Sequence, residues 1–143
     1  TGEVMGIDVT FGRAFYKAEL AAGTVLPTSG TVFLSLADGD KPAGIVVTKR
    51  LRALGFGIMA TPGTADYLSR FGYMVDAVVG KVSEGSKITA VNLIASGEIS
   101  FVINTPQGRG GRTDGEAIRK AANVHRVSSV TTVEAALENA MIF

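Results

Sequence analysis

The fold is decided by residues 31–60, TVFLSLADGDKPAGIVVTKRLRALGFGIMA. Its two ends, 31–37 and 56–60, are short and almost uninterrupted apolar runs, the pattern of strands that are covered on both faces of a sheet. Between them, residues 41–55 predict a helix with a proline in the first turn and a glycine at the end. A strand, a helix and a second strand in this order predict a right-handed unit with parallel strands.

The same alternation continues to the end of the chain. Further strands are predicted at 74–79, 99–104 and 128–132, and further helices at 64–72, 87–97, 114–126 and 134–142. Five strand–helix pairs predict a five-stranded parallel, doubly wound α/β sheet with helices on both faces, a Rossmann-like fold. Upstream, residues 10–22 have the pattern of an amphipathic helix, and the Gly-, Pro- and Ser-containing stretch 23–30 marks a boundary.

Composition narrows the class of protein. The chain has 143 residues, of which 46% are hydrophobic and 19% charged, so one domain with a real core is expected. A net charge of +1 argues against a nucleic-acid partner. The absence of cysteine and the single histidine argue against a metal site. No apolar run reaches the length of about 20 residues that a membrane span needs, so a cytoplasmic domain is expected.

The loops that follow the strands are where a doubly wound sheet binds its ligands. In the second of these loops, Thr61, Gly63 and Thr64 stand at the start of a helix, where unpaired N–H groups and the helix dipole favour an anion. Lys41 and Lys81 stand in the neighbouring loops and could complete a phosphate site. A simple N-cap role for Thr64 and solvated lysines explain the same residues without a ligand.

The glycine-rich stretch 103–122, INTPQGRGGRTDGEAIRKAA, is less specific. It lacks the ending of a nucleotide P-loop and the spacing of a dinucleotide site. Residues 113–116, TDGE, have the pattern of a capping box, which needs no ligand. Arg109 and Arg112 could be solvated, close over an anion or pair with a partner, whereas Asn104, at the end of a buried strand, could bond a ribose or a base edge.

Catalytic machinery is sparse. The chain has no cysteine nucleophile and no Gly-x-Ser-x-Gly elbow. Asp38 and Asp40 have no histidine beside them, and His125 falls near the end of a predicted helix. These residues favour a binding protein over an enzyme, with no catalytic residue assigned.

Seven segments of the chain resemble, in order, the C-terminal part of the carbamoyl phosphate synthase large subunit: TGEVMG, FGRAFYKAELAAG, LPTSGTVFLSLADGDK, LGFGIMATPGTADYL, KVSEGS, FVINTPQGR and DGEAIRKAA. The resemblance implies that residues 1–27 are the tail of a preceding synthetase domain with its linker. It implies that residues 28–143 are a methylglyoxal-synthase-like allosteric domain.

In bacterial members of this family, the domain binds UMP as an inhibitor and IMP as an activator. The resemblance assigns the effector phosphate to Lys41, Thr61, Thr64 and Lys81, and Gly63 belongs to the same tight turn. It assigns the nucleoside to Ser35, Asn104 and Thr105. The glycine-rich loop that carries Arg109 and Arg112 is a possible flap that becomes ordered when the ligand binds. Pro106 stands where some bacterial enzymes have a second threonine, which removes a hydroxyl from the nucleoside side.

The resemblance also implies a parent enzyme, a glutamine-hydrolysing, ATP-dependent ligase of arginine and pyrimidine biosynthesis. That enzyme would use ATP with Mg and K ions and would pair with a glutaminase small subunit, while this segment would hold no cofactor and no catalytic residue.

Two alternatives remain, a methylglyoxal-synthase-type phosphate lyase and a stand-alone nucleotide-sensing domain. The lyase resembles the same fold but needs a histidine in the first strand-end loop, where this chain has Ala37, and another in the fourth, near Arg112.

Overall fold

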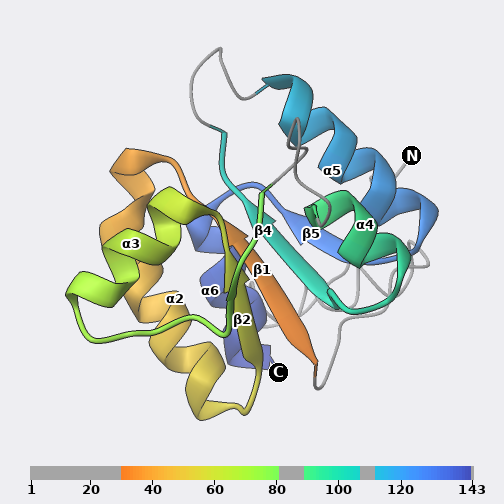
Figure 1. The fold of residues 1–143 in the computed structure, drawn as a ribbon. Helices are drawn as coiled ribbons and strands as arrows, with labels where there is room; N and C mark the ends of the chain where they lie inside the picture. The colour runs from red at the N-terminus through yellow and green to blue at the C-terminus, as the bar shows by residue number, and fades with distance from the viewer. Residues whose placement is uncertain (1–29, 81–88, 107–111, 143) are drawn as a thin grey trace.

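The computed structural model describes residues 30–80, 89–106 and 112–142, which form one layered α/β domain (Figure 1). Its strands are β1 (Thr31–Ser35), β2 (Gly57–Ala60), β3 (Ala77–Val78), β4 (Phe101–Asn104) and β5 (Ser128–Val130). Its helices are the short 3-10 helix η1 (Asp38–Asp40) and α2 (Lys41–Ala53), α3 (Pro62–Arg70), α4 (Ala90–Ala95), α5 (Arg112–Val124) and α6 (Val133–Ile142). No helix in these described ranges is long and apolar enough to cross a membrane.

The five strands form a single parallel sheet in the order β3-β2-β1-β4-β5. This confirms the predicted fold class and the predicted order of elements. The chain moves outward from β1 through β2 to β3, then crosses back to β4 and β5, so the direction of winding reverses between β1 and β4. In this architecture the reversal marks the place where ligands bind.

Several predicted boundaries were wrong by a few residues. The strand expected at 74–79 is only β3, because the regular pairing with β2 covers just Ala77 and Val78. Before it, Asp76 bonds to Ile58 of β2 partly through its side chain. The 3-10 helix η1 was not predicted at all. The helix expected at 10–22 lies outside the described residues.

Each face of the sheet carries its own apolar core. On one face, α2, α3 and α6 cover a cluster that includes Leu34, Leu51, Leu68 and Ala136. On the other face, α4 and α5 cover a smaller cluster around Phe33. Figure 1 shows the two groups of helices on opposite sides of the strands. Burial on both faces explains why the strands are apolar without alternation.

Four helices end in a Schellman motif, in which a residue in the left-handed conformation follows the helix. At the ends of α2, α3 and α4, the residue in the left-handed conformation is Gly55, Gly72 or Gly97, with φ of 91°, 88° and 85°. In each case the next N–H reaches back to a carbonyl five residues earlier, as in a Schellman motif. Helix α5 ends in the same way, with the bond Val127 N to Ala122 O at 2.8 Å, but its left-handed residue is Arg126, with φ of 55°.

Candidate functional site

Two buried polar side chains lie side by side at the point where the winding reverses. Ser35 ends β1 and Asn104 ends β4, and the two residues are direct partners in the parallel register. Ser35 is 0% exposed and Asn104 is 9% exposed, yet neither Ser35 Oγ nor Asn104 Oδ1 has a hydrogen-bond partner among the described residues. Buried polar atoms without a partner are uncommon in folded proteins. The described residues contain two more, Thr48 Oγ1 and Asn139 Oδ1, on helices, so it is the position of Ser35 and Asn104 at the strand ends that favours a ligand.

The face of the sheet to which these side chains point follows from the strand pattern. Phe33 and Val102, two residues earlier on each strand, belong to the core beneath α4 and α5. Ser35 and Asn104 therefore point to the same side, because side chains two apart share a face. Gly115 of α5 lies directly over the amide, since a Cβ atom on it would be 3.4 Å from Asn104 Nδ2.

Two threonines, one in the first turn of α3 and one directly after β4, bond to the backbone that leaves β1. Leu36 N donates to Thr64 Oγ1 at 3.0 Å, and Ala37 N donates to Thr105 Oγ1 at 2.7 Å. Thr64 and Thr105 are each 1% exposed. Their oxygens are acceptors in these bonds, so their hydroxyl protons remain to be donated elsewhere.

Thr61 extends this arrangement toward the surface. Its hydroxyl is 3.1 Å from that of Thr64, and one proton serves this mutual bond. Each hydroxyl has one proton, and only one of the two protons is used in the bond between Thr61 and Thr64. The other proton can be donated to a further acceptor, such as a ligand oxygen. Thr61 is only partly buried, and it immediately precedes α3.

The alternative role of Thr64 as a helix N-cap does not hold in the structure. Helix α3 begins at Pro62 and Thr61 occupies the N-cap position without a side-chain capping bond, so Thr64 lies inside the first turn. Its hydroxyl is turned toward the backbone after β1 instead of toward its own helix. The contact with another strand outweighed the local capping preference.

A lysine lies over this first turn of α3. Lys41 is the first residue of α2, and its side chain is only 12% exposed. A Cβ atom on Gly63 would be 3.3 Å from Lys41 Nζ, so the ammonium group rests against the backbone of α3. The first turn of a helix leaves N–H groups without intrahelical acceptors and carries a partial positive charge. The lysine, the helix end and the threonine hydroxyls together form a site suited to an anion.

The structure brings together six of the predicted residues, Lys41, Thr61, Gly63, Thr64, Asn104 and Thr105, with Ser35 beside Asn104. Lys81 and Arg109, which were predicted to belong to the site, lie outside the described residues. Arg112 is the first residue of α5, so this helix starts two residues before the predicted position. Thr113 therefore lies inside the helix and not at the N-cap that the capping-box pattern predicted.

Sequence reasoning missed the ionic partner of Lys41. Asp38 Oδ1 is 2.5 Å from Lys41 Nζ, and the Asp38 side chain is 87% exposed. The signal was present as an acidic and a basic residue three positions apart, a spacing that brings side chains together in helical turns. The described residues contain no group of three or more His, Cys, Asp or Glu side chains that could hold a metal ion.

Comparison with known proteins agrees with this architecture. A family model described as "MGS-like domain" matches residues 44–131, more than half of the chain. The "Carbamoyl phosphate synthase large chain, C-terminal section" of Methanopyrus kandleri is 52% identical over 137 residues, which cover 95% of this chain and 25% of that protein. Carbamoyl phosphate synthase large chains of Methanosarcina barkeri and Rubrobacter xylanophilus are each 48% identical, over 96% and 95% of this chain. The chain spans 13% of the length of those two relatives.

Proposed function

The chain belongs to the MGS-like domain family, and from this membership and its similarity to carbamoyl phosphate synthase large chains we propose that it is a regulatory domain that binds a nucleoside monophosphate. The domain performs no chemistry of its own in this proposal. The ligase reaction, its ATP and metal ions, and the contact with a glutaminase subunit belong to a longer synthase of which this domain would be one part.

One observation carries the proposal. Two unpartnered buried polar atoms, Ser35 Oγ and Asn104 Oδ1, lie where the winding of the sheet reverses, next to a second cluster built for an anion. A nucleoside monophosphate has both kinds of group, an anionic phosphate and neutral hydroxyl and base atoms. A site for inorganic phosphate alone would not need the serine and the carboxamide.

The phosphate would bind between Lys41 and the first turn of α3. Thr61 and Thr64 would donate the hydroxyl proton that their mutual bond leaves over, and Gly63 would let the phosphate and the lysine approach the backbone closely. Thr105 would donate its own proton nearby. The ribose or base would then reach Ser35 and Asn104.

Control of a distant reaction requires that the nucleotide bind one conformation of the synthase more tightly than another. A coupling free energy of about 1–3 kcal/mol between the two sites is typical of such control. The direction of the effect, activation or inhibition, depends on which conformation the nucleotide favours.

Titration calorimetry and thermal unfolding of the chain with UMP, IMP and inorganic phosphate test the proposal. A nucleotide at about 100 times its dissociation constant should stabilise the fold by about 2.7 kcal/mol. We expect UMP or IMP to bind more tightly than inorganic phosphate, because phosphate cannot reach Ser35 and Asn104. Equal affinities, or no shift with either nucleotide, would refute the nucleotide assignment.

A matched pair of lysine variants tests the phosphate side. Lys41→Met removes the charge at the site, and Lys49→Met removes the same charge from an exposed position on the same helix. We expect Lys41→Met to weaken nucleotide binding about tenfold or more, as is typical when a charged hydrogen bond is lost, and Lys49→Met to change it little.

Formation of methylglyoxal from dihydroxyacetone phosphate by the chain would support the lyase alternative instead.

A further inference from the structure

We propose that Asp38 is a built-in competitor for the anion that Lys41 binds, and that this carboxylate sets how tightly the site holds a phosphate group. The inference rests on the proposed function for the identity of the anion. It adds a specificity-determining residue that acts against binding.

The two partners of this ion pair are buried to very different degrees. Lys41 Nζ is held 2.5 Å from Asp38 Oδ1, but the lysine side chain is 12% exposed and the aspartate side chain is 87% exposed. The lysine is also restrained by the first turn of α3, because it lies against Gly63. The cation therefore stays in the site, while the carboxylate can rotate into solvent without losing packing.

Nothing else in the described part of the chain holds the Asp38 carboxylate. The backbone carbonyl of Asp38 accepts a hydrogen bond from Lys41 N–H, which fixes the turn of η1 independently of the side chain. Among the described residues, the Asp38 side chain bonds only to the ammonium group of Lys41. Loss of its charge should therefore leave the turn and the position of the lysine intact.

A ligand phosphate must replace this carboxylate on Lys41 or lie beside it. Replacement costs the free energy of an exposed ion pair, and coexistence places two negative groups within a few ångströms of each other. Measured exposed pairs are worth about 0.2–1 kcal/mol, a factor of about 1.5 to 5 in a binding constant. A phosphate group with two negative charges gains more from Lys41 than the Asp38 carboxylate does, so it can displace Asp38. A ligand carboxylate has the same single charge as Asp38 and gains nothing by replacing it. Asp38 would thus favour phosphate compounds over carboxylic acids.

Asp38→Asn removes the charge and keeps the size of the side chain. We expect this variant to bind inorganic phosphate and UMP about two to five times more tightly than the parent chain in calorimetry at fixed ionic strength. Asp66→Asn is the control, because Asp66 is also an exposed acid in an ion pair, with Arg70 at 2.7 Å on α3. The control changes the net charge equally and should change both affinities much less.

The double variant Asp38→Asn/Lys41→Met separates this inference from the proposed function. If Asp38 acts through the lysine, its substitution should have no effect once Lys41 is Met. Unchanged or weaker binding by Asp38→Asn, while Lys41→Met still weakens binding, would overturn the competitor role alone. If Lys41→Met also binds phosphate and UMP as well as the parent does, the phosphate site itself is wrong.

Discussion

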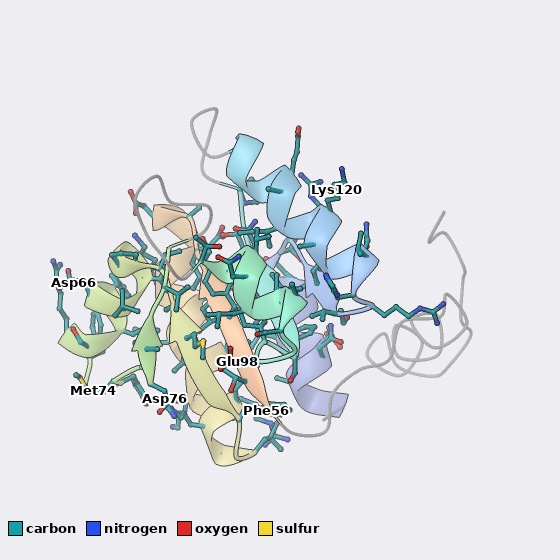
Figure 2. The ribbon with its side chains drawn as sticks, turned by 45° about the vertical axis from the view of Figure 1, so that its right-hand side comes forward. Phe56, Asp66, Met74, Asp76, Glu98 and Lys120 are labelled. Atoms are coloured by element: carbon teal, nitrogen blue, oxygen red, sulfur yellow. The ribbon has the colours of Figure 1, made fainter. Side chains whose placement is uncertain are left out.

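Asp76 should stabilise the attachment of the edge strand β3 to β2. Its ionised carboxylate makes the contacts, so its contribution to the free energy of unfolding should depend on pH. Its Oδ2 accepts hydrogen bonds from Ile58 N at 2.7 Å and from Arg52 Nη1 at 2.9 Å. Asp76 N donates in turn to Ile58 O at 2.7 Å, so the residue extends the pairing between β2 and β3. Figure 2 shows Asp76, Phe56 and Glu98 in the lower part of the view, where the strands begin. Substitution there tests the fold without touching the candidate site.

The expected magnitude follows from exposure. Asp76 is 54% exposed and Arg52 is 34% exposed, so their ion pair is worth at most about 1 kcal/mol after solvent screening. Ile58 is fully buried, and loss of the acceptor for its N–H costs about 1 kcal/mol more. We expect Asp76→Asn, which keeps a carbonyl acceptor, to lower the free energy of unfolding by about 0.5–1 kcal/mol. Asp76→Ala should lower it by about 1–2 kcal/mol.

The pH dependence of this effect has a definite sign. The bond from Ile58 N–H, followed by the bond and charge of Arg52, holds the pKa of Asp76 below its usual value despite the opposing effect of burial. A lowered pKa in the folded state adds stability above the unfolded pKa of about 3.9, and this is lost as the pH falls through the folded pKa. The difference between the parent and Asp76→Asn should be constant from about pH 7 to pH 5. It should narrow below about pH 4.

Urea unfolding of the parent, Asp76→Asn and Asp76→Ala across this pH range measures both effects. Asp66→Asn serves as the control, because its ion pair with Arg70 is exposed on both sides and receives no backbone N–H in the described structure. Equal stability of the parent and Asp76→Asn at pH 7 would refute the reasoning. So would a difference that grows on acidification.

Two further substitutions test local features of the fold. Thr105→Val, which keeps the shape of the side chain, removes the acceptor for Ala37 N–H and should cost about 1 kcal/mol in urea unfolding, whereas Thr105→Ser should cost less. Arg126→Gly should raise the free energy of unfolding by about 0.5–1 kcal/mol, because a side chain is strained at a φ of 55°; a loss of stability would show that the arginine side chain contributes more than the strain costs.

The fold was predictable because its signals are local. Continuous apolar runs identified strands buried on both faces, and the helices at 41–55, 64–72 and 87–97 were each expected to end at a glycine that proved to be left-handed. The Schellman motif at the end of α5 was not predicted, because its left-handed residue is Arg126 and not a glycine. The edge strand β3 was overestimated, since Asp76 takes over part of the pairing that a longer strand would provide.

The site was predictable only as a set of residues at strand ends, and their bonds were not. The partners of Thr64 and Thr105 are backbone N–H groups that lie 28 and 68 residues away along the chain. No local pattern distinguishes a threonine that caps its own helix from one that holds another strand, because both occur at the start of a helix. The register of β1 against its two neighbours decides between them. That register also places Ser35 beside Asn104, so the same strand pairing that builds the core determines which polar atoms are left for a ligand.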